Sequence, residues 1–456
     1  MKMKNRAEFN FKKGWKNNPE GKGVEAKEPF KDFGTERFNP ERYYSNEFMK
    51  LEWDNVWTKK WLLVCNVNDV SNVGDFYNFK IGKESIIVVR SSEKNINAFY
   101  NVCPHRGNRL INEDFGFIEK IGCSFHSWVF DLNGENEQVL DKETFRKEVL
   151  ENDLNLSKVK CEIECGFVWI TMNDKARPVR DYLGPVADYL DNYKINEMKV
   201  VRHVNSLWKA NWKTGLEAFY ETYHLSTVHP ETQTMMEDYH VQIDNWDNGM
   251  NRMIVPFIIP SIRYKDRSTI NESTSFLLGD VGISSEEFNG NIQEAKKLIQ
   301  NKKREISKKF NLGYERYTDA ELTDSFDYGI FPNIQIGCHP EGVFLFKFLP
   351  HPTDPEKFYL DTTINYRVVE GEEYSVPAWM GLPEDTDKSG KTRPEIVYYD
   401  ENEKPDLGLI LEQDSELIPY VQSGVRSRGF RGALWSEQEL RIRHFHYELN
   451  NSIKSN

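Results

Sequence analysis

A chain of 456 residues is long enough to form two or three domains, each with its own hydrophobic core. Its composition, 39% hydrophobic and 29% charged, is ordinary for a globular protein, and its net charge of −13 argues against a nucleic-acid partner. No run approaches the roughly 18–20 apolar residues that a membrane-spanning helix needs, and six cysteines in a chain of this length do not indicate a disulfide framework. These features predict a cytoplasmic protein without a membrane or nucleic-acid partner.

The first part of the chain predicts a small β-rich domain. Residues 1–40 are rich in Lys, Asn and Gly and are expected to form an N-terminal arm. Residues 41–61 have apolar residues at near-helical spacing and predict a leading helix. Short apolar runs then alternate with Gly, Asn and Asp turns, as at 85–89 and 166–170, which is typical of β-strands. We therefore expect an all-β domain with its leading helix at residues 41–180.

The remainder, residues 181–456, predicts a larger α+β domain that follows a Pro/Asp/Gly-rich junction. Its patterns predict strands at 200–208, 252–264, 329–350 and 358–368 and helices at 212–228, 284–311, 408–424 and 436–450. The helix at 284–311 is rich in Glu and Lys and is expected to be solvated. Residues 373–405 read as a long surface loop or lid.

Two cysteines and two histidines form two short motifs in the β-rich domain: Cys103 and His105 lie two residues apart, and Cys123 and His126 lie three apart. Thiolates suit the iron of an iron–sulfur cluster, and imidazoles on the second iron raise its potential. Mixed Cys/His motifs also bind structural zinc, and isolated Cys and His residues can simply belong to the core.

The local context of these motifs favours the cluster. The first reads Cys-Pro-His-Arg-Gly at 103–107, and the second reads Cys-Ser-Phe-His-Ser-Trp-Val-Phe at 123–130. In residue types and spacing they resemble the Rieske [2Fe–2S] motif. That resemblance implies that Cys103 and Cys123 hold one iron and that His105 and His126 hold the other.

A second pair of histidines lies at His224 and His229. Residues five apart on a regular helix point about 140° away from each other, so these imidazoles converge only if the helix deforms. The β-branched Thr227 and Val228 and the disfavoured helical geometry of the residue before Pro230 predict a break there.

Carboxylates accompany this pair of histidines. Glu221 precedes His224 by three residues and can accept a hydrogen bond from its distal N–H. A third ligand is expected from the segment Leu-Glu-Gln-Asp at 411–414, where Glu412 and Asp414 are the candidates. Two histidines and one carboxylate leave open positions on the metal, as in non-haem Fe(II) oxygenases.

From about residue 40 to 450, the chain resembles the catalytic α subunit of the Rieske non-haem iron oxygenases, the ring-hydroxylating oxygenase family. The match rests on Asn-Trp-Lys at 211–213 followed by an acidic residue and His-(four residues)-His at 224–229. It implies an α+β fold with a small all-β Rieske domain and a larger domain in which helices surround an antiparallel sheet, of helix-grip type. It also implies that His224, His229 and Asp414 hold a mononuclear Fe(II), with Glu412 the competitor for the third position.

In this family an acidic residue at the position of Glu221 bridges the cluster of one subunit to the iron of its neighbour. Many ring dioxygenases have Asp there, whereas Glu also occurs in oxygenases that act on quaternary amines. The resemblance therefore implies a catalytic, electron-bridging role for Glu221 and leaves the substrate class open.

The implied function is a terminal oxygenase that takes electrons from a ferredoxin or reductase, and indirectly from NAD(P)H, and inserts oxygen from O2 into a small organic molecule. Aromatic-ring hydroxylation is the main expectation, and monooxygenation or demethylation of a non-aromatic or quaternary amine is the alternative. A Rieske electron carrier without oxygenase activity and a zinc-stabilised binding protein are further alternatives. The resemblance also implies a homotrimer, with or without small β subunits.

Overall fold

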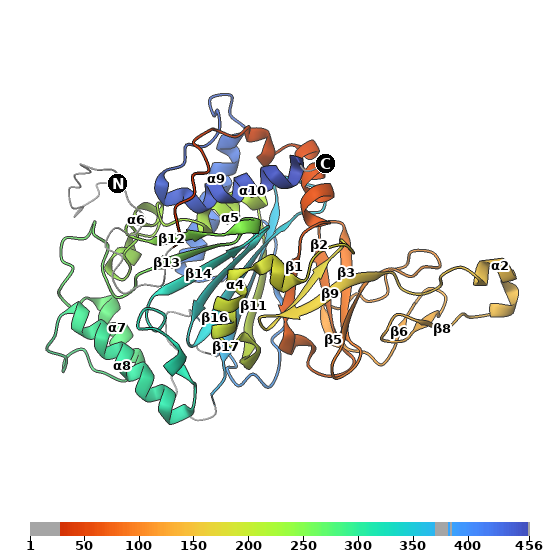
Figure 1. Cartoon of the computed structure of the whole chain (residues 1–456), viewed down its shortest axis with the longest axis horizontal. Helices are drawn as coiled ribbons and strands as arrows, with labels where there is room; N and C mark the ends of the chain where they lie inside the picture. Colours follow the sequence, from red (N-terminus) through yellow and green to blue (C-terminus); the bar gives the residue numbers. More distant parts are fainter. Residues whose placement is uncertain (1–27, 370–381, 384, 455–456) are drawn as a thin grey trace.

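The structure is a computed structural model that describes residues 28–369, 382–383 and 385–454. Two β-sheets with different surroundings dominate it (Figure 1). The expected arm at 1–40 and loop at 373–405 lie partly outside the described residues. No helix in the described ranges is both long enough and apolar enough to span a membrane.

The first sheet has the strand order β1-β10-β9-β4-β3-β2-β5, and a three-stranded sheet, β6-β7-β8, extends from it at one side of Figure 1. The short apolar runs form its central strands, in which Ile86 to Val89 are all fully buried. The strands are β1 (Leu62–Asn66), β2 (Asp75–Ile81), β3 (Glu84–Arg90), β4 (Ile96–Tyr100), β5 (Phe115–Phe117), β6 (Ile121–Gly122), β7 (Val129–Phe130), β8 (Asn136–Gln138), β9 (Lys158–Glu164) and β10 (Phe167–Thr171).

The second sheet has the order β12-β13-β14-β15-β16-β17-β11-β18 and is antiparallel except for the β11–β18 pair. Strands that follow one another along the chain from β12 to β17 pair in turn, with α7 and α8 inserted between β13 and β14, and β11 pairs with β17 along its full length. The strands are β11 (Met198–Trp208), β12 (Gln242–Asn245), β13 (Asn251–Val255), β14 (Ser325–Ile330), β15 (Ile334–His339), β16 (Gly342–Pro350), β17 (Phe358–Arg367) and β18 (Val397–Tyr399).

Helices flank the second sheet, with α5, α9 and α10 at the top of the view and α7 and α8 at its lower left (Figure 1). The helices are α1 (Asn46–Glu52), α2 (Lys147–Leu150), α3 (Val179–Leu183), α4 (Pro185–Asn192), α5 (Trp212–Phe219), α6 (Leu225–Val228), α7 (Glu272–Asp280), α8 (Ile292–Phe310), α9 (Leu409–Val425) and α10 (Leu440–Lys454). Short 3-10 turns lie at 40–43, 67–70, 142–144, 195–197, 230–234, 247–249, 314–316 and 437–439, and a π-helical turn follows α1 at 53–57.

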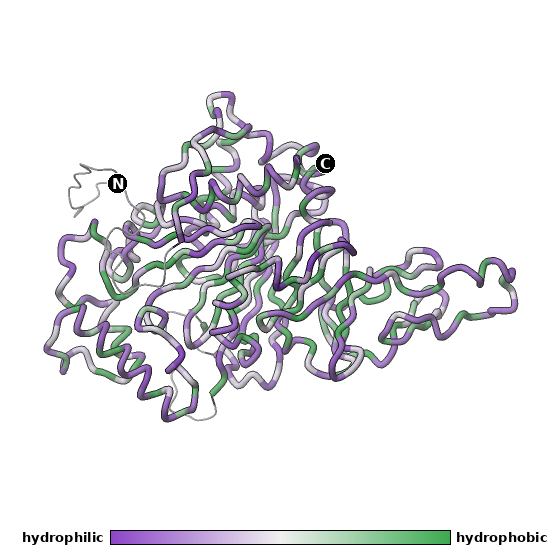
Figure 2. The backbone as a smooth tube through the Cα atoms, viewed as in Figure 1, coloured by the Kyte–Doolittle hydropathy of each residue, from purple (hydrophilic) through white to green (hydrophobic). Residues whose placement is uncertain are grey.

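One hydrophobic cluster joins the two sheets. It contains Val64 and Ile86 from the first sheet and Trp208 and Leu360 from the second. The buried Lys347 of β16 also donates a hydrogen bond to the carbonyl of Val64 in β1, at 2.9 Å. Figure 2 shows hydrophobic stretches along the strands of both sheets and hydrophilic stretches along the outer loops. The α+β fold expected from the sequence, with a small all-β part and an antiparallel sheet flanked by helices, is confirmed.

Several sequence expectations about individual elements are wrong. The strand expected at 252–264 ends at Val255, because the next residue, Pro256, has no N–H to donate. The helix expected at 284–311 begins at Ile292 and is not merely solvated, since Ile292, Ala295 and Ile299 form a buried stripe that packs beside α7. The long loop expected at 373–405 contains β18, which pairs in parallel with β11.

Candidate metal centres

The two Cys/His motifs occupy loops at the far end of the first sheet, one after β4 and one between β6 and β7. Each loop closes tightly on its cysteine: Gly107 donates to the carbonyl of Cys103 at 3.0 Å, and Ser127 donates to the carbonyl of Cys123 at 2.9 Å. Both turn residues have left-handed backbone, with φ of 76° at Gly107 and 52° at Ser127. Glycine adopts this conformation freely, which explains the Gly in the first motif.

The four side chains face one another across these loops. The rings of His105 and His126 lie 4.6 Å apart between centroids, and Cys103 and Cys123 are both buried. The Nδ1 atoms of both histidines are buried and have no hydrogen-bond partner among the described residues. A buried polar atom without a partner is costly, and two such nitrogens beside two buried thiols fit the ligand set of a Rieske cluster. Trp128 stacks on His105 at 5.0 Å and shields this side.

The second histidine pair converges on one carboxylate. The Nε2 atoms of His224 and His229 lie 3.7 Å and 3.2 Å from Oδ1 of Asp414. One ligand atom from each of the three residues lies within 4.8 Å of the others, which is compact enough for a single ion. Both imidazoles thus present the same nitrogen to the same point. This set fits a mononuclear site with two histidines and one carboxylate.

The other nitrogen of each imidazole is also engaged. His224 Nδ1 lies 2.5 Å from Oε1 of Glu221, and His229 Nδ1 lies 2.6 Å from Oε1 of Gln413. Such contacts fix the tautomer and orientation of a metal-binding imidazole. Gln413 was not singled out by the sequence analysis. Its position beside Asp414 was the signal, because neighbouring residues of one helix turn can reach the same imidazole.

Glu412, the competing candidate, faces a different partner. Its Oε2 lies 2.9 Å from the ammonium of Lys404. Asp414 is buried, whereas Glu412 lies partly exposed on the first turn of α9. Of the two candidate carboxylates, the structure brings Asp414 to the histidines.

The helix predicted at 212–228 is interrupted, and the interruption explains how the histidines converge. Helix α5 ends at Phe219, a turn follows, and α6 begins after His224. His229 leaves helical geometry, with φ of −121° and ψ of 61°, as expected for a residue before proline. The predicted distortion at His229 is confirmed, but the main break lies before His224, where the sequence analysis did not place it.

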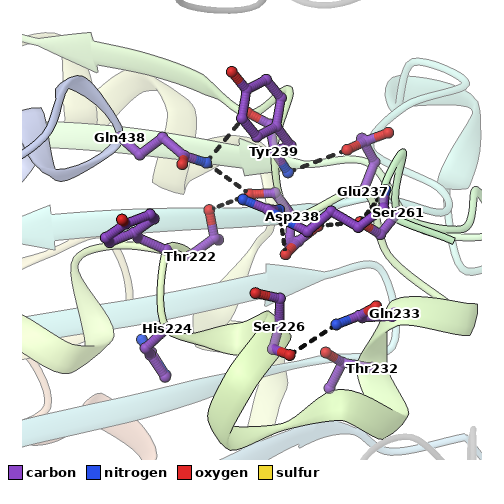
Figure 3. A network of polar contacts seen from close by, with 12 residues as sticks. Thr222, His224, Ser226, Thr232, Gln233, Glu237, Asp238, Tyr239, Ser261 and Gln438 are labelled. Carbon is purple, nitrogen blue, oxygen red and sulfur yellow. Dashed lines mark hydrogen bonds and ion pairs between the residues drawn. The ribbon is translucent and has the colours of Figure 1, made fainter. Parts of the chain in front are cut away.

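Side chains from distant segments hold the turn between α5 and α6 (Figure 3). Thr222 Oγ1 donates to the carbonyl of Asp238 at 2.7 Å, and Gln438 Nε2 donates to the same carbonyl at 3.2 Å. The carboxylate of Asp238 in turn accepts from Ser261 and Arg263. Within the turn, Oε2 of Glu221 accepts from the backbone N–H groups of Tyr223 and His224. Both carboxylate oxygens of Glu221 are thereby engaged.

The carboxylates set the electrostatics of His224. Burial disfavours its charged form, but the hydrogen bond and charge of Glu221 and the charge of Asp414 together raise its pKa above the ordinary value. The electrostatic potential at the imidazole is therefore negative, which favours a cation at this point.

Helix α5 packs directly against the second sheet and carries a buried charged side chain, Lys213. Gly215 makes this close approach possible, because a Cβ there would lie 2.4 Å from the ring of Phe358 in β17. Lys213 is fully buried and lies 2.5 Å from Oε1 of Glu52. Asn211 caps the helix by accepting from the N–H of Lys213.

Glu217, on the same helix, accepts from Tyr43 Oη at 2.7 Å and contacts His446 Nε2 at 2.8 Å. The guanidinium of Arg42 donates to His446 Nδ1, so the proton on this imidazole lies on Nε2 and is donated to Glu217. Burial raises the pKa of Glu217 to about 7, against the opposing effect of the bond from Tyr43.

Another described group, Glu164, Cys165 and Asp191, also has ligand-type atoms close together. Here Arg180 donates to Glu164 at 2.7 Å and to Asp191 at 2.9 Å. Since Arg180 already supplies the positive charge, this group does not need a metal.

The fold and both sites define a class of protein in which an iron–sulfur type Cys/His site and a two-histidine, one-carboxylate site share one chain. Comparison with known proteins identifies the same two parts of the chain. Residues 60–151 match the model of the Rieske [2Fe-2S] domain, and residues 190–455 match that of the ring hydroxylating alpha subunit (catalytic domain). The chain belongs to the ring-hydroxylating oxygenase α-subunit family.

Curated relatives match over part of their length. The oxygenase subunit of glycine betaine monooxygenase from Chromohalobacter salexigens is 30% identical over 206 residues, which is 44% of this chain and 45% of the relative. The oxygenase subunit of carnitine monooxygenase from Escherichia coli K12 is 31% identical over 45% of this chain and 57% of the relative. The large oxygenase component of the naphthalene 1,2-dioxygenase system from Pseudomonas fluorescens is 31% identical over 40% and 42%. The chain spans about half the length of these relatives.

Solved structures share the fold over nearly the whole chain. A quaternary ammonium Rieske monooxygenase in complex with L-carnitine aligns with a TM-score of 0.62 at 20% identity, covering 92% of this chain and 96% of that one. Naphthalene 1,2-dioxygenase with indole in the active site aligns with a TM-score of 0.62 at 20% identity, covering 89% and 90%. At 20% sequence identity, these alignments show a shared fold.

Proposed function

We propose that the protein is the terminal oxygenase component of a Rieske system that inserts oxygen from O2 into an organic substrate. The observation that carries this proposal is the convergence of His224 and His229 on Asp414, in a chain that also places two buried thiols beside two unpartnered imidazole nitrogens. The domain division at 1–40, 41–180 and 181–456 belongs to the same proposal.

In this proposal Cys103, Cys123, His105 and His126 hold a [2Fe–2S] cluster, and His224, His229 and Asp414 hold Fe(II). When bound, these groups supply single-electron transfer and O2 activation. The chain's own residues orient the ligands: Gln413 and Glu221 fix the two imidazoles. Hydrogen bonds from Thr222 and Gln438 to the carbonyl of Asp238 hold the turn before His224. Glu221 would also be the residue through which the two centres of adjacent subunits communicate.

For the substrate, we propose a quaternary amine as the first candidate and an aromatic ring as the second. The amine is supported by the names of the glycine betaine and carnitine relatives and by the Glu at position 221, and the aromatic ring by the naphthalene relative. We further propose that a ferredoxin or reductase, supplied with electrons by NAD(P)H, is the electron donor. We also propose that the protein assembles as a homotrimer, with or without β subunits, and is located in the cytoplasm.

The experiment is to purify the protein with its iron and count iron per chain. About three irons support the oxygenase, whereas about two support an electron carrier. Oxygen uptake is then measured with carnitine, glycine betaine and naphthalene in the presence of a reductase. Uptake that matches substrate loss only with naphthalene would reverse the order of the two candidates. Absence of the third iron would contradict the oxygenase proposal itself.

A further inference from the structure

A cavity of about 390 Å³ lies between helices α7 and α8 and the end of strand β15. His224, His229 and Asp414 are not among the residues that line it. In Figure 1, α7 and α8 lie apart from α9, which carries Asp414. The cavity is thus separate from the candidate iron site, and its volume lies in the range of small-ligand pockets, about 300–1,000 Å³.

Most of its wall is apolar. Phe257, Leu277, Ile299 and Phe310 come from three separate segments that meet around the cavity. Ile258, also in the wall, has a φ of 56°. This left-handed conformation is strained for a β-branched residue, and such strain concentrates at binding and functional sites.

The polar end of the cavity is a buried ion pair. Lys303 Nζ lies 2.8 Å from Oε1 of Glu341 and donates to the carbonyl of Leu322 at 2.8 Å. The other oxygen, Oε2 of Glu341, is buried and has no hydrogen-bond partner among the described residues. Glu341 is only 3% exposed, and a buried acceptor without a donor is costly.

The charges around this acceptor decide which donor it can take. Lys303 already balances the charge of Glu341, and a second cation would be repelled by its ammonium. Burial and the charge of Lys303 lower the pKa of His339, which also lines the cavity, to about 3, so its imidazole is neutral at ordinary pH. Asp280 and Lys309, which also line the cavity, carry opposite charges, so the charged groups of the lining balance overall while Glu341 Oε2 lacks a hydrogen-bond donor.

We propose that this cavity is a second ligand site, distinct from the iron site, for a small uncharged molecule with an apolar body and one hydroxyl or N–H group that donates to Glu341 Oε2. A phenol-type molecule has this chemistry. The proposal does not depend on which reaction the iron site performs.

The test uses the full chain in its iron-loaded form with two probes, p-cresol and 4-methylanisole. The second probe is the methyl ether of the first and therefore has no hydroxyl to donate. Calorimetric titration should show that p-cresol binds at least about tenfold more tightly, because a hydrogen bond to a charged acceptor is among the stronger ones. In Glu341→Gln this preference should fall at least about threefold. Equal affinity of the two compounds for the wild type, or an unchanged preference in the variant, would overturn the proposal.

Location is tested with a matched pair on one helix. Leu277→Trp fills the cavity and should abolish p-cresol binding, whereas Phe276→Trp, whose parent side chain is exposed and does not line the cavity, should leave it intact. Asp414→Ala should also retain binding. Loss of binding in Asp414→Ala, or its persistence in Leu277→Trp, would place the molecule elsewhere and refute the second site. Unchanged visible spectra and unfolding midpoints identify variants that are correctly folded.

Discussion

Nδ1 of His229 lies 2.6 Å from Oε1 of Gln413, while Nε2 of the same imidazole faces Asp414, the next residue of helix α9. Two consecutive residues therefore engage the two nitrogens of one histidine. Since Gln413 can accept the N–H of Nδ1, it leaves Nε2 free of a proton and able to bind a metal.

Gln413→Ala should weaken iron binding without removing a ligand. Loss of an orienting partner of this kind typically costs about 10–100-fold in metal affinity. Iron retained after dialysis against a graded chelator series reports the change, and Glu412→Ala is the matched control on the same helix turn. Equal iron retention in Gln413→Ala and the wild type would show that Gln413 does not orient His229.

Asp414→Ala should abolish turnover and remove the third iron, while the visible spectrum of the cluster remains. The reason is that Asp414 is the carboxylate on which both imidazoles converge. Oxygen uptake and iron content are measured together. Full activity in this variant would show that another residue is the third ligand. Glu412→Ala should remain active, because the carboxylate of Glu412 is paired with Lys404 and does not face the histidines.

Glu221→Gln should slow turnover and leave both metal contents unchanged. The amide keeps the shape of the side chain and can still hydrogen-bond His224. It lacks the negative charge with which Glu221 favours the positively charged form of the imidazole. Single-turnover kinetics of cluster oxidation measure the step directly. Wild-type rates in this variant would argue against the bridging role.

Breaking the buried pair of Lys213 and Glu52 should be strongly destabilising. Either Lys213→Met or Glu52→Met leaves one uncompensated charge in the core, which costs about 3–5 kcal/mol, whereas the double variant should lose much less. Urea unfolding of the three variants gives the comparison. The exposed pair of Lys50 and Asp54 is the control, and Lys50→Met should cost less than about 1 kcal/mol. Additive losses in the double variant would contradict this account.

Glu217 should make stability depend on pH. Burial raises its pKa from 4.5 to about 7, so the protonated form is favoured in the folded state. Its contribution is complete below about pH 4.5 and is lost as the pH rises through about 7, by up to about 3 kcal/mol. Its neighbour His446 acts oppositely: burial lowers its pKa, so its contribution is present above about pH 6.5 and falls below that pH.

The difference in unfolding free energy between wild type and Glu217→Gln isolates the first effect, because His446 is common to both. Between pH 5 and 7 the wild type should lose stability relative to the variant. Parallel pH profiles would show that Glu217 stays ionised in the folded protein.

Short-range signals predicted which side chains come together better than they predicted the elements around them. The spacing of Cys103, His105, Cys123 and His126 carries local chemistry, and the proline after His229 carries a local backbone constraint. The partners of Lys213 and Glu217 lie about 160 to 230 positions away along the chain, and no periodicity reveals such pairs. The parallel pairing of β18 with β11 is equally long-range, so the surrounding Pro- and Gly-rich sequence predicted only a loop.

The hydrophobic cluster that joins Val64 and Ile86 to Trp208 and Leu360 has a consequence for protein engineering. Cutting the chain after the first sheet would expose apolar surface on both fragments and would strip Val64 of the donor supplied by Lys347. Chimaeras in which the N-terminal half is exchanged with that of a relative should therefore aggregate unless the facing residues of β11, β16 and β17 are exchanged with it. We therefore expect the two halves to unfold together as one cooperative unit.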